Sequence, residues 1–475
     1  MGKVSSICDL SKREVAKNRM SLSSDHSPDS IPAPWQISMP WLWFTVVVGG
    51  ILLLCATPLI AIAIWRTNNA AEVRRLTTKI EAKGEPVTAG QLATEFSIPK
   101  GRVDVSRQLL DAMAPLSTGA FRGQAKAIPV VGTEINVAPK IGEPWPDIQE
   151  AERLLASNEF SLSNVDQAVQ LGCYARFSLA YSKGHSTSLA TLQDVRSLMR
   201  LLLLDFAVKA HKNDVAGATK SLRALLMMSR CCQQEPMLVA QLIRYQLDGV
   251  AKSSLADTVC LLNFDESDLL EFRAILQAHK PIDSLRTALL GERALGLMGM
   301  ENTQLIDSTL PATAAFESDK VTYLIFMERY IAAIESGFPE ALFEVENIDL
   351  ELSRKTSGMS KLTAKMTMRL LANSSMLAAF DAMARDIATS NAADAGIAIE
   401  LFRRQNRTLP KTLDELVPKH LSSIPLDPYS GASMRYRIDE KGFAIYSVGR
   451  NKTDDGGGSL DNQVKDVGLY FPVRQ

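Results

Sequence analysis

One uncharged stretch constrains this chain more than any other feature of its sequence. The 25 residues from Trp41 to Trp65 include no Asp, Glu, Lys or Arg, and a tryptophan stands at each end. As a helix at about 1.5 Å per residue, the stretch is roughly 38 Å long, against about 30 Å for the core of a bilayer. Tryptophan is enriched at membrane–water interfaces. The stretch therefore predicts an uncleaved single-pass transmembrane helix, with one tryptophan at each headgroup layer.

The charges that flank this stretch leave its orientation open. Residues 21–40 contain no Lys or Arg, whereas five basic residues lie between positions 66 and 83. By the positive-inside rule this difference places the large C-terminal part in the cytoplasm. Five more basic residues lie between positions 3 and 19, however, and long domains cross a membrane largely regardless of their charge. Charge alone is thus compatible with both orientations.

The rest of the chain is long enough to bury a large core. The sequence has 475 residues, 46% of them hydrophobic, with 52 Lys and Arg against 53 Asp and Glu. This balance argues against nucleic acid as a partner, because binding it needs a basic surface. The six cysteines form no C-x-x-C pattern. We expect them to be small buried side chains rather than a disulfide framework.

Proline, glycine and the spacing of apolar residues divide the chain into segments. The predicted fold class is mainly α: an N-terminal transmembrane helix, a multi-helix body and a small α+β C-terminal module. Within the body, the spacing predicts two helices joined by a short turn between Asp205 and Arg230. The predicted segments are a disordered tail at 1–40, the transmembrane helix at 41–65, a stalk with short helices at 66–114, a Pro/Gly-rich loop at 115–147, the helical body at 148–405 and the module at 406–475.

The sequence contains no recognised catalytic motif. No two of its five histidines lie within 20 residues of each other, and it has no Walker loop, G-x-G-x-x-G or G-x-S-x-G. Near the C-terminus, Asp454, Asp455, Asp461 and Asp466 lie in a glycine-rich turn. Calcium takes about six to eight oxygen ligands, which a flexible acidic loop supplies. These four residues are therefore the candidate metal site, for Ca²⁺, although their spacing is not that of an EF-hand.

Three blocks follow one another near the C-terminus: FRRQNRTLPKTLDELVP, IPLDPYSGASMRYR and GFAIYSVGRNKTDDGG. They resemble the C-terminal module of the major pseudopilins of type II secretion, and this resemblance implies a pseudopilin-like module with calcium in its last loop. Ser430, between Tyr429 and Gly431, departs from the family pattern. A pilin is not implied, because residues 37–46 lack the family's processing glycine and its glutamate. The matching positions are Phe402, Asn406, Pro410, Pro425, Asp427, Pro428, Tyr429, Gly431, Tyr436, Tyr446, Ser447, Gly449 and Asp455.

Two further segments are AKGEPVT at residues 82–88 and GERALGL at residues 291–297. With the apolar stretch and the C-terminal blocks, they make residues 41–472 resemble an uncharacterised family of planctomycete single-pass membrane proteins. The resemblance implies a bacterial envelope protein in the inner (cytoplasmic) membrane, with its body on the extracytoplasmic side. It implies no particular activity.

These expectations favour a membrane-anchored envelope protein that binds protein partners and takes part in an assembly, without catalysis. The alternative is a hydrolase or a ligand-binding protein with a dispersed site in the helical body. The two hypotheses differ in what the fold brings together. A pocket lined by converging His, Asp or Glu side chains favours the alternative, and an uninterrupted solvated surface favours the first hypothesis.

Overall fold

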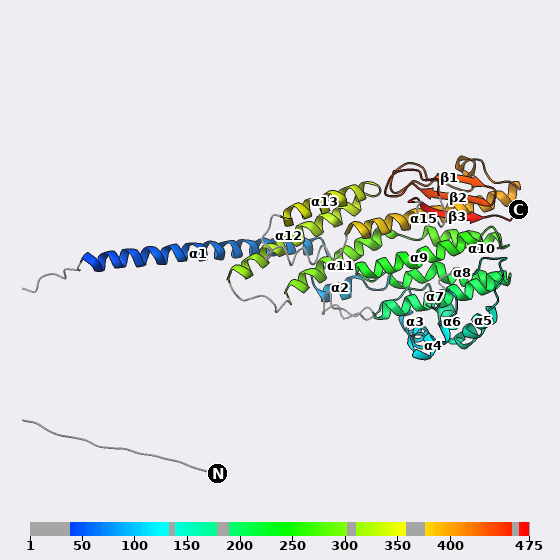
Figure 1. The fold of residues 1–475 in the computed structure, drawn as a ribbon, viewed down its shortest axis with the longest axis horizontal. Coiled ribbons are helices and arrows are strands. Elements are labelled where there is room, and N and C mark those ends of the chain that lie inside the picture. Colours follow the sequence, from blue (N-terminus) through cyan, green and yellow to red (C-terminus); the bar gives the residue numbers. More distant parts are fainter. Residues whose placement is uncertain are drawn as a thin grey trace, which may run out of the picture. The chain divides into compact units, whose positions relative to one another are not determined.

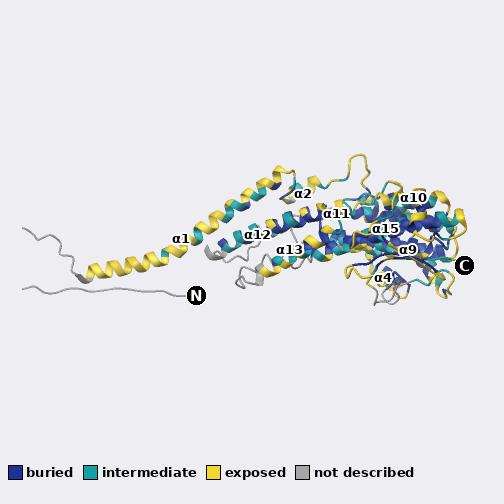
Figure 2. Cartoon of the chain, turned by 90° about the horizontal axis from the view of Figure 1, so that it is seen from above, coloured by how far each residue is buried: buried dark blue, intermediate teal, exposed yellow. Residues whose placement is uncertain are grey.

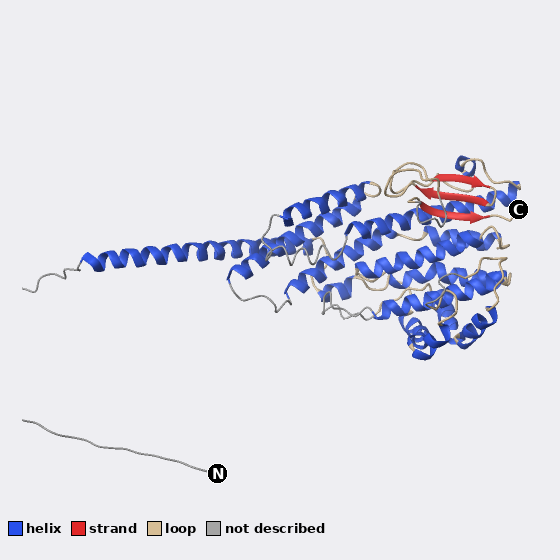
Figure 3. Ribbon diagram, viewed as in Figure 1, coloured by secondary structure: helices blue, strands red, loops and turns tan. Residues whose placement is uncertain are grey.

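The structure is a computed structural model, and most of the chain in it is helical (Figure 1, Figure 3). It describes residues 39–132, 138–177, 190–301, 310–357, 376–457 and 465–474. The predicted tail lies outside the described residues except for its last two positions. A mainly helical chain with one long apolar helix near the N-terminus and a small sheet near the C-terminus is confirmed.

Some consecutive helices are joined by turns of a few residues, and longer segments separate others. The three strands come after the last long helix, as the change in sequence character predicts. The bounds are α1 (Met39–Ala82), α2 (Ala89–Glu95), α3 (Ser106–Met113), α4 (Gly119–Ala125), α5 (Ile148–Ser157), α6 (Glu159–Gln170), α7 (Ala190–His211), α8 (Val215–Met228), α9 (Leu238–Thr258), α10 (Glu266–Gln277), α11 (Pro281–Glu301), α12 (Leu310–Glu335), α13 (Glu340–Ser357), α15 (Met376–Asn406), β1 (Arg435–Asp439), β2 (Gly442–Ser447) and β3 (Val467–Pro472).

Helix α1 is long and apolar enough to cross a membrane. Within the part of the chain that the structure describes, the large side chains of its apolar stretch are exposed, and Figure 2 shows this stretch almost entirely in the colour of exposed residues. Leu54, for example, is 74% exposed. In a helix that is apolar on all sides, no face is set apart for packing against a protein core. The pattern is the one expected of a helix surrounded by lipid.

The end of α1 and the turn after it are bound to the body by ion pairs. Lys83 contacts Glu328 of α12 at 2.8 Å. Glu85 contacts two arginines of α11, Arg286 at 2.8 Å and Arg293 at 2.9 Å. The side chain of Arg293 is only 1% exposed. Residues 61–475 form one compact unit that includes this junction.

The predicted pair of helices between Asp205 and Arg230 is confirmed as α7 and α8. Asn213 takes a positive φ of 57° in the turn between them. The side chain of Asp214 then accepts a hydrogen bond from the amide of Gly217 at 3.0 Å and so caps the N-terminus of α8. The turn chemistry is therefore encoded locally, in two adjacent polar residues.

Helix α9 lies inside the body and packs on α8, α11 and α15 (Figure 1). Pro236 precedes it, and its first amide, that of Leu238, donates to the carboxylate of Glu292 on α11 at 2.8 Å. The N-terminal amides of a helix have no partner within the helix, so this contact replaces a local cap. Here a capping residue comes from a helix some 50 positions later in the sequence.

The strands form an antiparallel sheet in the order β1-β2-β3 that packs against α15 and α9. Phe443 of β2 pairs with Phe471 of β3, and their rings stack with centroids 4.8 Å apart. Phe471 lies against Gly396 of α15, where an added Cβ would stand 2.1 Å from the ring. Only glycine allows the helix and the sheet to approach this closely.

Asp427 holds together the turn that leads into the sheet. Its buried carboxylate accepts hydrogen bonds from the hydroxyls of Ser447 at 2.6 Å and Ser430 at 2.9 Å. It also accepts from the amides of Tyr429 at 2.8 Å and Val448 at 3.1 Å. A carboxylate with four donors has a structural role, and Ser430, the departure from the pseudopilin pattern, supplies one of them.

The segment predicted as a Pro/Gly-rich loop contains helical structure. A 3₁₀ turn at Ala114–Ser117 is followed by α4. Thr118 accepts a hydrogen bond from the amide of Phe121 at 3.2 Å, and the ring of Phe121 is buried. A capping threonine and one buried aromatic residue thus form a helix in a segment that proline and glycine otherwise interrupt. Residues 133–137 of this segment lie outside the described residues.

The cysteines of the body are free and buried, as predicted: Cys173, Cys231, Cys232 and Cys260. Burial raises the pKa of the Cys173 thiol to about 12. A thiol with such a pKa stays protonated at neutral pH, and only the thiolate is a nucleophile. These side chains therefore act as small apolar residues of the core.

Candidate functional site

The candidate site begins with three charged residues on one face of α9. Arg244, Asp248 and Lys252 follow one another at intervals of four residues, which places them one above the other along the helix. All three are buried: Arg244 is 1%, Asp248 5% and Lys252 2% exposed. Buried charges are costly unless they are paired, so their partners define the site.

Two residues from other elements complete the cluster. His279 lies in the turn between α10 and α11, and its Nε2 is 2.5 Å from the carboxylate of Asp386 on α15. Lys252 donates to the same carboxylate at 2.5 Å and to the main-chain carbonyl of Asp386 at 3.0 Å. The cluster therefore connects α9, α15 and the turn after α10. We call Arg244, Asp248, Lys252, His279 and Asp386 the α9 cluster.

The hydrogen bonds of His279 fix its tautomer. Its Nδ1 lies 2.7 Å from a terminal nitrogen of Arg244, and a guanidinium only donates. Nδ1 therefore carries the lone pair, and the proton sits on Nε2, which donates to Asp386. Arg244 also donates to the hydroxyl of Ser284, which in turn donates to the carbonyl of Lys280 at 3.1 Å. Both nitrogens of the imidazole are thus occupied.

The cluster balances its own charge. Two cations, Arg244 and Lys252, face two carboxylates, Asp248 and Asp386, around a neutral imidazole. Burial by itself raises the pKa of Asp386, but the Lys252 ammonium and the hydrogen bond from His279 outweigh burial and hold that pKa well below its usual range. Asp386 is therefore ionised at neutral pH.

Two buried polar atoms of the cluster have no hydrogen-bond partner: Nε of Arg244 and Oδ2 of Asp248. They lie 4.0 Å apart, too far for a direct hydrogen bond. The same Oδ2 is 3.6 Å from Nε2 of His279. One buried donor and one buried acceptor without a hydrogen-bond partner thus lie side by side in the cluster.

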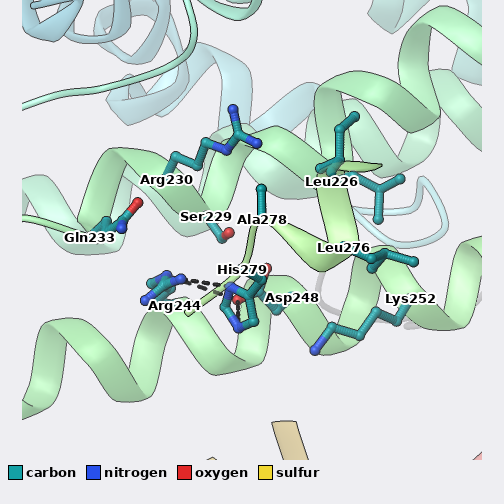
Figure 4. Close-up of a pocket in the computed structure, with 11 residues that line it drawn as sticks. Leu226, Ser229, Arg230, Gln233, Arg244, Asp248, Lys252, Leu276, Ala278 and His279 are labelled. Carbon is teal, nitrogen blue, oxygen red and sulfur yellow. Dashed lines mark hydrogen bonds and ion pairs between the residues drawn. The ribbon is translucent and has the colours of Figure 1, made fainter. Parts of the chain in front are cut away.

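Both residues with an unused atom line a narrow pocket between the end of α8, α9 and α10. In Figure 4, His279 lies between Arg244 and Asp248. Its wall combines Leu226 and Leu276 with Ser229 and Arg230 of the 3₁₀ turn after α8 (Ser229–Cys232), and with Gln233 directly after that turn. The pocket as a whole has room for roughly one water-sized particle.

Metal binding fits the cluster poorly, although Asp248, His279 and Asp386 place three ligand atoms within 4.8 Å of one another. Nε2 of His279 carries a proton and so offers no lone pair to a metal. A metal-bound histidine normally donates its other N–H to an acceptor, whereas Nδ1 of His279 faces the donor Arg244. Lys252 already supplies the positive charge beside Asp386.

The predicted calcium residues lie in the loop between β2 and β3, apart from the α9 cluster in the sequence. Asp466 accepts hydrogen bonds from the amides of Asp455 at 3.0 Å and Gly457 at 2.7 Å, so it connects both ends of the loop. Asp454 accepts from the hydroxyl of Tyr446 at 3.0 Å, and burial together with this bond raises the pKa of Tyr446 to about 12. Asp461 lies outside the described residues, and the calcium site stays a prediction.

The sequence alone did not identify the α9 cluster. Its signal was present in Arg244, Asp248 and Lys252, three charges at helical spacing on a face that otherwise carries apolar residues. The same spacing also occurs on solvated helix faces. The decisive partners, His279 and Asp386, are 107 positions apart. No local pattern connects them.

The comparisons with known proteins do not narrow the function. No protein-family model, no curated protein and no solved structure matches this chain. The resemblances to the pseudopilin module and to the planctomycete family therefore stay predictions, and the function has to be argued from the site itself.

Proposed function

We propose that this chain is a membrane-anchored binding protein whose helical body takes a small polar ligand in the pocket beside His279. One observation supports this proposal above all others. Arg244 and Asp248 leave a buried donor and a buried acceptor without a hydrogen-bond partner at the pocket, whereas both ring nitrogens of His279 and the ammonium of Lys252 have partners. Leaving such atoms unpaired costs roughly 1–3 kcal/mol each, and a ligand that satisfies them recovers that free energy.

The bonding of the cluster favours binding over hydrolysis. A general base needs a free nitrogen, but His279 accepts from Arg244 and donates to Asp386. The hydroxyl of Ser284 accepts from Arg244 and donates to the main-chain carbonyl of Lys280, so both of these residues hold it in place. The proposal therefore keeps a ligand site in the helical body and leaves out hydrolysis.

Ligand binding is tested by ligand-detected NMR on the detergent-solubilised full chain, with a panel of neutral, anionic and cationic small molecules. We expect at least one class to bind and the variant Asp248→Leu to lose it. Asp205→Leu is the matched control, because Asp205 is also a buried helical carboxylate paired with a lysine, Lys209, at 2.6 Å. Binding by none of the classes, or equal binding by both variants, would refute the proposed site.

The proposed location is the inner (cytoplasmic) membrane, with the body extracytoplasmic. The exposed apolar stretch of α1 supports the anchor, and the planctomycete resemblance supports the orientation. Alkaline extraction of membranes tests the anchor: the chain should stay with the lipid. A reporter fused after Gln475 tests the orientation, and cytoplasmic reporter activity would refute the extracytoplasmic placement.

A second candidate function is assembly with protein partners of the envelope through the C-terminal module. The antiparallel sheet that packs on the long helix α15 favours it, because the pseudopilin resemblance implies a small α+β module in this part of the chain. Calcium would stabilise the loop of Asp454, Asp455, Asp461 and Asp466. Isothermal titration of the full chain with Ca²⁺, alongside Asp455→Ala, is the test, and no heat of binding in either protein would remove calcium from the proposal.

A further inference from the structure

We infer that the outer edge of strand β1 takes an extended, acidic segment of a partner protein as an additional strand. This inference rests on the second candidate function, assembly through the C-terminal module, and names the surface and the kind of partner. It follows from the main-chain groups along this edge, from one uncovered apolar side chain and from two arginines on the same strand.

The main-chain groups along one side of β1 are available for pairing. Strand β1 lies at one end of the described sheet, whose order is β1-β2-β3 (Figure 1). Asp439 and Gly442 close the two-residue turn between β1 and β2. The closing pair of such a turn is hydrogen-bonded and bonded pairs alternate along the ladder, so the amides and carbonyls of Tyr436 and Ile438 point away from β2. Within the part of the chain that the structure describes, no main-chain group outside the ladder bonds to them.

One apolar side chain on the inner face of the sheet, that of Ile438, is left uncovered. It lies on the same face as Tyr436, whose ring contacts that of Phe443 with centroids 6.0 Å apart. Phe443 is the cross-strand partner of Ile438 and is fully buried, whereas Ile438 is 44% exposed. An apolar side chain on a further strand, placed opposite Ile438, would cover it and extend the inner face of the sheet.

Two arginines lie on the other face of the same strand. The side chain of Arg435 is 50% exposed and lies 3.7 Å from the carboxylate of Asp454. The side chain of Arg437 is 45% exposed, lies 3.6 Å from the carboxylate of Asp439 and donates to the carbonyl of Gly457 at 3.5 Å. These contacts are longer than an ordinary hydrogen bond. Both guanidinium groups, with five N–H donors each, therefore keep donors for carboxylates on an added strand.

The arginines determine the kind of strand that fits. Charged side chains on an edge strand discourage indiscriminate pairing. Opposite charges on neighbouring strands stabilise a pair, and like charges directly opposite each other destabilise it. Asp439, the carboxylate of β1, already accepts a hydrogen bond from the hydroxyl of Tyr470 at 2.7 Å. A strand with carboxylates opposite Arg435 and Arg437 and an apolar residue opposite Ile438 therefore fits this edge, and a basic strand does not.

The experiment adds short peptides to the full chain in detergent. The probe is a fluorescein-labelled peptide of alternating glutamate and valine, and the matched control alternates lysine and valine at the same length. Fluorescence anisotropy measures binding, and hydrogen exchange read by mass spectrometry measures the protection of β1. We expect saturable binding of the acidic peptide and none of the basic one, together with slower exchange of the amides in residues 435–439.

Three variants localise the binding. Ile438→Pro removes one outward amide and leaves the bonds to β2 in place, because an edge strand tolerates proline where its nitrogen faces solvent. It should abolish both the anisotropy change and the protection. The double variant Arg435→Glu with Arg437→Glu should transfer binding to the basic peptide, and it decides the test if Ile438→Pro fails to fold. Arg107→Glu reverses an exposed arginine of α3 and should bind as the wild type does.

Several results would overturn the inference. Binding of neither peptide, or equal binding of both, would remove the acidic strand. Binding of the acidic peptide without protection of β1, or unchanged in Ile438→Pro, would place it elsewhere on the surface. Self-association of the chain that Ile438→Pro abolishes would assign the edge to a second copy of this chain.

The assembly function is measured separately, by chemical crosslinking of the chain in its native membranes. Crosslinks between the C-terminal module and other envelope proteins that persist in Ile438→Pro would keep the assembly function and overturn only the role of the β1 edge. The absence of such crosslinks from the wild type and from the variant would overturn the assembly function and this inference together.

Discussion

Helices α1 and α9 differ in which kind of side chain is exposed and which is buried. The apolar stretch of α1 carries no charge and is exposed, whereas α9 carries Arg244, Asp248 and Lys252 at buried positions. A charge-free helix needs an apolar surrounding, and lipid supplies it without any specific partner. Buried charges need specific partners, which only a folded body supplies. The composition of α1 therefore indicates that lipid surrounds it, whereas the composition of α9 does not show whether its charged face is solvated or buried.

The largest expected effect concerns the insertion of the apolar helix α1 into the membrane. Replacing Leu53 and Leu54 together by Arg should cost about 6–8 kcal/mol of membrane insertion, because each arginine is strongly disfavoured near the centre of a bilayer and each leucine is favoured. The chain should then move from the membrane pellet to the supernatant on alkaline extraction. The pair Leu53→Ile and Leu54→Ile is the control and should stay in the pellet. Retention of the arginine variant would mean that another part of the chain binds the membrane.

The next largest effect concerns the buried charges of α9. Asp386→Ala leaves the buried Lys252 without its carboxylate and should lower the free energy of unfolding by about 3–5 kcal/mol. The double variant Lys252→Met with Asp386→Leu should recover much of this loss, since no charge is then left unpaired. Asp111→Ala, at an exposed pair with Arg107, should change stability by less than about 1 kcal/mol. Urea unfolding of the solubilised chain measures the stability of all three variants. A small effect of Asp386→Ala would contradict the buried pairing of Lys252 with Asp386.

Replacing a glycine by alanine tests how closely a helix packs against its neighbours, and α15 and α1 each offer such a glycine. Gly396→Ala drives a methyl group into the ring of Phe471 and should destabilise the body by about 1–3 kcal/mol. Nothing lies within 4 Å of the Cβ position at Gly49 in α1, so Gly49→Ala should leave unfolding of the body unchanged. Thermal unfolding of the two variants against the wild type decides the matter. Equal melting temperatures would show that the sheet does not pack on α15 as described.

The smallest effect is a dependence on pH in the acid range. The pKa of Asp386 is held below its usual range in the folded chain, so the unfolded chain binds more protons between the folded value and about 4. Stability from this group is therefore complete above about pH 5 and declines as pH falls toward the folded pKa. Urea unfolding between pH 2 and pH 6 should be less sensitive to pH in the Lys252→Met, Asp386→Leu variant than in the wild type. Identical pH profiles would argue against a depressed pKa.

Local patterns predicted much of the secondary structure. In the sequence, Pro236 and the helical spacing of the apolar residues after it predict a helix over about 236–262, and α9 spans Leu238–Thr258. The residues from Phe443 to Val448 predict a strand, and β2 spans Gly442–Ser447. The short helix α4 was not expected, because a single buried ring, that of Phe121, stabilises it in a segment rich in proline and glycine.

The candidate site could not be predicted in the same way. The charges of α9 follow helical spacing, but this spacing does not distinguish a solvated face from a buried one. Lys252 and Arg244 can be buried only if Asp386 and His279 lie within hydrogen-bonding distance of them. Both of these partners are distant from α9 in sequence. The residues predicted to bind calcium, in contrast, lie close together in sequence, and the loop that carries them has its own local bonds.

The sequence by itself determined that one helix of this protein is suited to lipid, since 25 uncharged residues have the same preference in any tertiary arrangement. It also determined where most helices and the three strands lie, because turns, caps and periodicity act over a few residues. Only the tertiary structure decided that three charges of α9 are buried, neutralised and left with one donor and one acceptor unused. The reason is physical: apolar transfer adds up residue by residue along a chain, whereas the pairing of a buried charge depends on the position of its partner in space.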